Sequence, residues 1–350
     1  LHNRWQHALK SPLQFRFGGS GLEVLEEDLR TCRPAGFKDM ERIIRFSNGN
    51  PRISTAGGPP VELVFDKEGR NIPPALRPIA GMVYAAKHSA KLGWNEINNK
   101  EDVHFASRLG TLVMDGEEAY NQDPAFLCVK CSISPLKIGP DSAEVLWELA
   151  QQKLPLGVAP MPLAGGTSPV TPAANLLITN TDIMGMIVAL YAAGSVTRQE
   201  HLALTGIMDM QTCAASFSPP NVVLQDAAAS ELYTSFYGIR CDAATDYIDA
   251  KFPGYQSGME RAFKISTLLT AGVVYPSIGQ LKAGLVCSPE QACLDIEAFD
   301  WMHHYVRGVE VTEETLCADI IRKEGVGGHF LGAEHTLENY REQLFMPQLA

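Results

Sequence analysis

Short apolar runs rich in β-forming residues alternate with longer segments of helical periodicity along most of the chain after residue 50. The predicted strands are Arg52–Ala56, Pro78–Tyr84, Phe126–Ile133, Leu156–Pro160, Leu202–Met208, Ile239–Ala243 and Val273–Pro276. The predicted helices between them are Asp102–Tyr120, Ser142–Lys153, Ala173–Ala193, Val222–Tyr237 and Gly258–Ala271. Strands that alternate with helices at this spacing predict βαβ units and a mostly parallel sheet.

The number of these strand–helix units favours an α/β fold of the (β/α)8 TIM-barrel type. Such a barrel needs roughly 250 residues, which fits residues 51–308. We expect its eighth strand in a short form at Gly284–Cys287, before a helix at Pro289–Tyr305. The nearest glycine cluster, Gly18–Gly21, lies in a predicted hairpin and not in a strand-to-helix turn. It therefore does not predict a dinucleotide site.

Two extensions flank the predicted barrel. Residues 1–50 form an N-terminal extension, with a hairpin near Phe15–Leu25 and a helix at Phe37–Phe46. Residues 309–350 form a C-terminal helical extension, in which Thr312 is expected to cap a helix.

Composition and charge narrow the function. The 350 residues include 40 acidic and 29 basic side chains, which gives a formal net charge of −11. A general nucleic-acid binder needs a basic face, so no nucleic-acid partner is expected. The longest apolar stretch, Ile183–Gly194, is too short to cross a bilayer, and the first residues contain no apolar signal-peptide core. We therefore expect a cytoplasmic protein with no membrane partner.

The eight cysteines are scattered and indicate reduced, mostly buried thiols. Cys128 and Cys131 form one C-x-x-C inside an apolar run that predicts a buried strand, and no second half of a zinc site follows. The sequence has no H-E-x-x-H and no G-x-S-x-G, which argues against a zinc hydrolase and an α/β-hydrolase. We expect no metal ion bound by the chain itself.

Candidate chemistry lies in the loops that follow the predicted strands, because the active site of a barrel lies at the carboxyl ends of its strands. The residues selected in this way are Tyr84, Ser134, Gly165, Gly166, Thr167, Asp209, Asp242, Asp246, Asp249, Lys251, Tyr275 and Gln280. Carboxylates with tyrosines nearby suit a quaternary ammonium, which has no N–H to donate and is held by charge and aromatic faces. Each aspartate alone is also typical of a helix cap or a solvated loop.

The loop after the fourth strand is the most unusual. Gly165 and Gly166 precede Thr167, and this pattern suggests close approach of the backbone to a ligand or partner. A strained loop needed only for packing between helix and strand explains the same pattern equally well. Thr171 with Pro172 then predicts the start of a helix.

At these loops the sequence resembles the trimethylamine methyltransferase family of corrinoid-dependent methyltransferases, which includes glycine betaine methyltransferases. The matching stretches are Ser134–Leu136, Ala159–Thr171, Met208–Met210, Asp249–Lys251 with Pro253 and Gln256, Gly258 with Glu260, Gly327–Gly332, His335–Leu337 and Tyr340–Arg341. They spread over most of residues 15–349, with matching order and spacing.

The resemblance implies a (β/α)8 barrel that moves a methyl group from a methylated amine to the cobalt of a corrinoid (cobalamin). That corrinoid is carried by a separate corrinoid-binding protein, and we also expect a homo-oligomer. Asp209 and Asp246 are the expected catalytic residues, and Tyr84, Asp242, Lys251, Tyr275 and Gln280 are expected to bind the amine. Gly165, Gly166, Thr167 and Ser134 are expected to face the corrinoid.

Two departures from the family bear on the substrate. The trimethylamine enzyme carries pyrrolysine, and none is apparent here, so the resemblance implies a quaternary amine such as glycine betaine. Gly279–Gly284 stands where a Trp-Leu-Glu-Gly-type stretch is expected, and its Lys282 replaces an acid. Two other readings stay open: a barrel lyase or aldolase that uses Lys251 as a Schiff-base amine, and a non-catalytic betaine-binding barrel.

Overall fold

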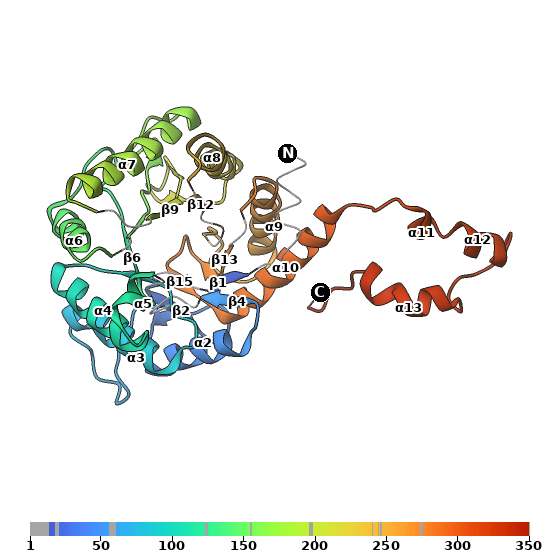
Figure 1. Ribbon diagram of the computed structural model, residues 1–350, viewed down its shortest axis with the longest axis horizontal. Helices are drawn as coiled ribbons and strands as arrows, with labels where there is room; N and C mark the ends of the chain where they lie inside the picture. Colours follow the sequence, from blue (N-terminus) through green and yellow to red (C-terminus); the bar gives the residue numbers. More distant parts are fainter. Residues whose placement is uncertain are drawn as a thin grey trace.

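Parallel strands and surrounding helices form one α/β ring (Figure 1). The structure is a computed structural model that describes residues 14–17, 21–55, 61–122, 125–154, 156–195, 199–239, 241–243, 245, 247–273 and 276–349. Eight strands follow one another around the ring in chain order: β1 (Phe15–Phe17), β4 (Ile53–Thr55), β5 (Trp94–Glu96), β6 (Leu127–Lys130), β7 (Leu156–Val158), β9 (Gln199–Ala203), β12 (Cys241–Ala243) and β13 (Ser277–Ile278).

These strands form two parallel sheets, one in the order β13-β1-β4 and the other in the order β12-β9-β7-β6-β5. Within the described residues, no backbone pairing joins β4 to β5 or β12 to β13. Other contacts join the strands at both junctions. A Cβ atom on Gly93, just before β5, would lie 3.0 Å from Cβ of Thr55 at the end of β4. Thr245, after β12, exchanges two hydrogen bonds with the backbone of Ser277 in β13.

Helices follow the strands and cover the outside of the ring. They are α2 (Phe37–Gly49), η1 (Pro74–Leu76), α3 (Arg77–His88), α4 (Lys100–Val113), α5 (Glu117–Gln122), α6 (Pro140–Gln151), α7 (Pro172–Ala192), α8 (Pro220–Glu231), the π-helix η2 (Leu232–Tyr237), α9 (Tyr255–Thr270) and α10 (Pro289–Arg307). Several begin with proline at the first position, where its missing N–H has no helical partner to lose.

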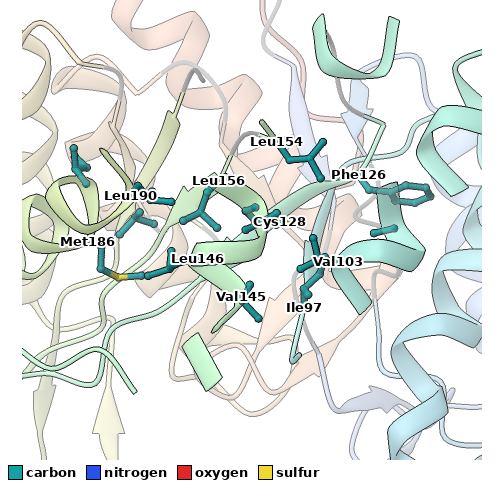
Figure 2. Close-up of a cluster of buried hydrophobic side chains, with 14 of the residues drawn as sticks. Ile97, Val103, Phe126, Cys128, Val145, Leu146, Leu154, Leu156, Met186 and Leu190 are labelled. Carbon is teal, nitrogen blue, oxygen red and sulfur yellow. The ribbon is translucent and has the colours of Figure 1, made fainter. Parts of the chain in front are cut away.

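The largest core cluster lies between the sheet and helices α4, α6 and α7 (Figure 2). Cys128 and Leu156 pair across β6 and β7 and are both buried. Val145 and Leu146 of α6 and Met186 of α7 pack against them (Figure 2). The prediction that Cys128 is a buried strand residue is confirmed. Desolvation raises the pKa of its thiol to about 12, so Cys128 stays a neutral thiol packed in the core.

Two small sheets stand beyond the carboxyl ends of the barrel strands. One has the order β11-β10-β8, from β8 (Leu163–Ala164), β10 (Gly206–Met208) and β11 (Ala215–Ser216). The other has the order β14-β15-β2-β3, from β2 (Glu23–Leu25), β3 (Cys32–Pro34), β14 (Gln280–Leu281) and β15 (Val286–Cys287). Because β8, β10, β2 and β14 each continue from a barrel strand, both sheets mark the carboxyl end of the barrel.

Three sequence predictions about strands are wrong. The segment Pro78–Tyr84 is helix α3, in which Pro78 stands in the first turn. Gly284–Cys287 supplies β15 of the outer sheet, and the missing barrel strands are β1 and β5. The hairpin near Phe15–Leu25 is also not formed, because β2 pairs with β3 while β1 pairs with β4 and β13. Residues 1–50 therefore contribute a strand to the barrel.

The C-terminal extension is helical, as predicted. It contains α11 (Glu313–Leu316), α12 (Ala318–Glu324) and α13 (Glu334–Gln343). The Thr312 side chain accepts a hydrogen bond from the backbone N–H of Thr315 and caps α11. These helices project away from the ring as an arm (Figure 1).

Helix α7 is long and apolar enough, by length and composition alone, to cross a membrane. Core helices of soluble proteins pass the same test, and α7 lies in the outer layer of helices, in contact with α6 and α8. Its inner side includes buried Ile183, Met186 and Leu190.

Candidate functional site

The β10–β11 hairpin and the loop between β12 and α9 are tied together by the carboxylate of Asp249. It accepts hydrogen bonds from the backbone N–H groups of Phe217 at 2.8 Å and Ser218 at 3.1 Å, and from the Ser216 hydroxyl. Asp249 lies in the loop between β12 and α9, whereas Ser216 ends the β10–β11 hairpin. Charge-assisted bonds of this kind are stronger than neutral ones. They hold the hairpin over the carboxyl end of the barrel.

Glu260 of α9 reinforces the same junction. Its Oε2 accepts hydrogen bonds from the Ser218 hydroxyl at 3.0 Å and from the backbone N–H groups of Asp249 and Ala250 at 2.9 and 3.0 Å. Gln256 donates to Oε1 at 2.7 Å. The stretch 249–260, which carries part of the family resemblance, therefore forms a hydrogen-bonded corner at the carboxyl end of the barrel. We call this end of the barrel the mouth.

Two buried cations on the inner side of α9 also hold the mouth loops, and the sequence analysis missed both. Arg261 pairs with Asp295 of α10 at 2.7 Å and donates to the carbonyls of Thr245 and Gln280. Burial raises the pKa of Asp295, partly offset by Arg261. Arg261 therefore joins the loop after β12 to strand β14.

Lys264 is the second buried cation. Its ammonium donates to the carbonyls of Phe217 at 3.1 Å and Tyr247 at 2.9 Å, and it lies 3.7 Å from the Asp226 carboxylate of α8. Asp226 also accepts from the Thr205 hydroxyl at 2.6 Å. A spacing of three residues places Arg261 and Lys264 on the same side of the helix. This spacing was the feature of the sequence that could have pointed to the pair.

The glycine loop after β8 is a tight turn packed against two methionines. Gly165 has φ +85°, a left-handed conformation that favours glycine. A Cβ atom on Gly165 would lie 3.3 Å from Sδ of Met210, and one on Gly166 would lie 2.5 Å from Cε of Met208. The Thr167 hydroxyl accepts a hydrogen bond from the backbone N–H of Leu163 at 2.8 Å. The loop thus contacts the hairpin that carries Asp209.

Asp209 itself is exposed in the turn of the β10–β11 hairpin. Hydrogen bonds from the Gln211 backbone and the Thr212 hydroxyl lower the pKa of its carboxyl. This arrangement keeps the carboxylate charged and positioned at the mouth. Asp242 is placed in β12 by its backbone, opposite Leu202 of β9. Asp246 and Tyr275 lie outside the described residues.

Other predicted site residues have structural partners. Ser134 donates to Asp182 of α7 at 2.6 Å, and Leu136 donates its backbone N–H to the same carboxylate. This anchors the loop after β6 onto α7. Gln280 is fully buried in β14, beneath the mouth loops. Lys251 is exposed and lies within the stretch 249–260.

Tyr84 does not join this group. It lies on α3, where its ring packs against Phe37 of α2 and against His88. Burial raises the pKa of its hydroxyl. It lines a groove of about 1080 Å³ beside α2 and the turn Asp66–Gly69, away from the loops that carry Asp209 and Lys251. The strand that was predicted to bring it to the mouth is a helix.

Exposed apolar side chains lie along one part of the mouth. They come from the loops after β6, β7, β10 and β12: Ile133, Leu136, Met161, Val170, Met210 and Phe252. Val170 is 72% exposed and Met210 is 71% exposed. Apolar rims of this kind mark protein-docking surfaces. We name this set the apolar rim.

Lys251 and Lys264 bear on the alternative of a lyase or aldolase, which would need a lysine amine at the mouth to form a Schiff base. Lys251 is exposed and lacks the apolar pocket that activates such an amine. Lys264 is buried but faces a carboxylate and two carbonyls. In the part of the chain that the structure describes, no group of three or more His, Cys, Asp or Glu side chains is placed to hold a metal ion.

An α/β ring of this kind belongs to a large structural class, and comparison with known proteins shows to which family within that class the chain belongs. Residues 17–350 match the trimethylamine methyltransferase (MTTB) family, and the chain belongs to that family. It is 25% identical to trimethylamine methyltransferase MttB of Desulfitobacterium hafniense over 93% of this chain and 64% of that protein. It is 23% identical to a glycine betaine methyltransferase of the same species over 95% of this chain and 68% of that protein.

Another similar relative is the Methanosarcina barkeri trimethylamine methyltransferase MttB, at 30% identity over 75% of this chain and 52% of that protein. The chain thus spans about half to two thirds of the length of these relatives. Among solved structures, the Methanosarcina barkeri monomethylamine methyltransferase (MtmB) matches with a TM-score of 0.52 and 14% identity, over 89% of this chain and 63% of that chain. This likeness concerns the fold alone.

Proposed function

We propose that the protein transfers a methyl group from a quaternary amine of the glycine betaine type to the cobalt of a corrinoid held by a partner protein. The observation that carries the proposal is that three family-matching stretches, Ala159–Thr171, Met208–Met210 and Asp249–Lys251, come together at one end of the barrel. The glycine loop contacts Met208 and Met210, and Asp249 and Glu260 tie that hairpin to the corner before α9. The family and this geometry together support the proposed activity, substrate and partner.

A quaternary amine needs little acid–base help from the protein. When its methyl group passes to the cobalt, the C–N bond breaks and the nitrogen keeps the electron pair, leaving as a neutral tertiary amine. The remaining task is to hold the cation with one methyl group toward the open mouth. Asp209, Asp242 and Asp246 are the acids proposed for this task, and Lys251 is proposed to face the carboxylate of a betaine.

The apolar rim supports a partner that docks over the mouth. The corrinoid is the methyl acceptor, and its carrier must bring the cobalt to the amine. Val170 and Met210 are both exposed, and both lie within 4 Å of where a Cβ atom on Gly165 would stand. Burial of such side chains drives association. We propose that Gly165, Gly166 and Thr167 lie beneath this docked partner.

The test is methylation of cobalt followed by absorbance. Free Co(I) cobalamin is supplied with glycine betaine, tetramethylammonium or trimethylamine. We expect turnover of glycine betaine, with weaker use of tetramethylammonium because it lacks a carboxylate for Lys251. Turnover of trimethylamine alone would contradict the quaternary-amine proposal. Binding of betaine without any methyl transfer would favour the non-catalytic betaine-binding barrel, and borohydride trapping with a carbonyl substrate would favour the lyase.

A further inference from the structure

The C-terminal arm, residues 308–349, contacts little of its own chain. None of the residues in α11, α12 or α13 is buried. The tip returns to α10, where the Phe345 ring packs against Trp301 and His304 and the backbone of Gln348 donates to Glu297 at 2.7 Å. The arm is therefore anchored at both ends, and most of it stands away from the ring (Figure 1).

The arm carries many exposed apolar side chains. They are Val309, Val311, Leu316, Ile321, Val326, Phe330, Leu331, Leu337, Tyr340, Leu344, Met346 and Leu349. Summed over these side chains, the exposed area is on the order of 1,000 Å², comparable with the roughly 800 Å² that each partner buries in a stable interface. This area is sufficient for association with another protein.

Contacts of α10 show from which end of the barrel the arm departs. Asp295, early in α10, accepts a hydrogen bond from the N–H of Gly279, beyond the carboxyl end of β13. Later in the helix, Asp300 pairs with Arg52 at 2.6 Å, just before β4. The helix thus runs toward the amino ends of the strands, and the arm begins there. A partner that docks over the mouth is at the opposite end.

The family-matching run Gly327–Gly332 builds the arm and not the mouth. A Cβ atom on Gly328 would lie 2.4 Å from the carbonyl oxygen of Glu324, so the turn after α12 requires glycine there. Thr336 donates to the carbonyl of Phe330 at 2.7 Å and fixes the turn before α13. These contacts shape the arm while Leu331 stays 88% exposed and Leu337 stays 75% exposed. A shaped segment with outward apolar residues is typical of an interface.

The barrel offers a surface of matching chemistry on the outer side of α7, α8 and η2. The exposed residues there are Leu177, Val188, Tyr191, Leu224 and Phe236. Asp182 is the one charged residue of α7, and it is buried against Ser134. A helix that is apolar all round is normally covered. Figure 1 shows α7 and the arm at opposite ends of the molecule, so one chain cannot join them.

We propose that the arm binds the outer face of α7, α8 and η2 on a second copy of this chain. Both surfaces are apolar, each lacks a partner among the described residues, and each is too far from the other within one chain. A second copy supplies both at once. The interface lies away from the mouth, so it leaves the apolar rim open to the corrinoid carrier.

The test measures the mass of the full-length chain by analytical ultracentrifugation. The wild type is expected to sediment as an assembly of at least two 38.1 kDa chains. The double variant Leu331→Glu with Leu337→Glu is expected to lose at least half of that mass, and Val188→Glu is expected to do the same. Leu112→Glu on α4 is the matched control, since Leu112 is 79% exposed and lies on neither surface.

Thermal melting of each variant checks that the fold is retained, since all substituted side chains are exposed. A wild type that sediments as a 38.1 kDa monomer would overturn the proposal. The proposal would also fail if the wild type gained mass only after a corrinoid protein or lipid vesicles were added. Retention of the assembly by the arm variant would also overturn it. So would an intact assembly in Val188→Glu beside a dissociated arm variant, because the two surfaces would then not be partners.

Discussion

Lys264 Nζ lies 3.7 Å from a carboxylate oxygen of Asp226, and both side chains are completely buried. Lys264 also holds the carbonyls of Phe217 and Tyr247, which belong to two separate mouth loops. The cost of desolvating both charges is offset in part by their mutual attraction and by these hydrogen bonds. The pair therefore connects the packing of α8 against α9 with the shape of the mouth.

Lys264→Met is expected to destabilise the protein by about 3–5 kcal/mol, because it leaves the Asp226 carboxylate buried without its cation. Urea unfolding measures the loss. Lys251→Met is the control, since Lys251 is exposed and its loss should change the free energy of unfolding by less than about 0.5 kcal/mol. The pair Asp226→Asn with Lys264→Met should recover part of the stability. A double variant less stable than Lys264→Met would contradict this account.

The same carboxyl predicts how stability depends on pH. Burial raises the pKa of Asp226 from 3.8 to about 6, partly offset by Lys264 and Thr205. Between these values the unfolded chain releases the proton while the folded chain keeps it, so unfolding is favoured as pH rises. The Asp226 contribution to stability is therefore present in full below about pH 4 and is lost by about pH 6.

Asp226→Asn should flatten the fall in the free energy of unfolding between pH 4 and pH 6, measured by denaturant titration. Asp209→Asn serves as the control, because Asp209 is exposed and hydrogen bonds lower its pKa. An unchanged slope in Asp226→Asn would show that other groups produce the dependence.

The sequence predicted the long helices better than the barrel strands. Helix α7 was expected at Ala173–Ala193 and lies at Pro172–Ala192. The agreement is close because a long apolar segment after Thr-Pro predicts a helix and is too long for a strand. Strands β1 and β5 have three residues each, too few to show an alternation. The run Pro78–Tyr84 was mistaken for a strand because a short apolar run fits a strand or a buried helix equally well.

The site was predictable where loops carry unusual residues. The glycine loop and the Met208–Met210 hairpin lie in contact, as their positions after neighbouring strands implied. Arg261 and Lys264 were not predictable from composition, because cations on a helix usually indicate its solvent side. Their burial follows from how α9 packs against α8 and α10, which depends on contacts between distant parts of the chain.

Gly166→Val distinguishes the two readings of the glycine loop. Its side chain would meet the flexible end of Met208, which can move, so we expect thermal stability to fall by only a few degrees. Methyl transfer should fall at least about tenfold if the loop lies beneath the corrinoid carrier. Activity and melting temperature are measured together. If methyl transfer and melting temperature fell together, and adding Met208→Ala to Gly166→Val restored both, the glycine would serve packing alone.

Met210→Glu tests the apolar rim. Met210 is 71% exposed, so the substitution should leave the fold intact. A buried charge at the docked interface should raise the KM for the corrinoid protein about tenfold, equivalent to about 1.4 kcal/mol. Transfer to free cobalamin should stay unchanged, as should both reactions in Leu112→Glu. Equal loss with both acceptors would place Met210 in amine binding instead of docking.

Thr245 supplies the link between β12 and β13, where described residues show no backbone pairing. Its hydroxyl accepts a hydrogen bond from the N–H of Ser277 at 2.5 Å and donates to the Ser277 carbonyl at 3.0 Å. Thr245 is 1% exposed, so water cannot replace either bond. Thr245→Val keeps the shape but leaves the buried N–H unpaired, which should cost about 1–3 kcal/mol. Thr245→Ser keeps the hydroxyl and should cost less, and hydrogen exchange at the Ser277 amide should accelerate only in the valine variant. Similar exchange in both variants would show that other contacts close this side of the barrel.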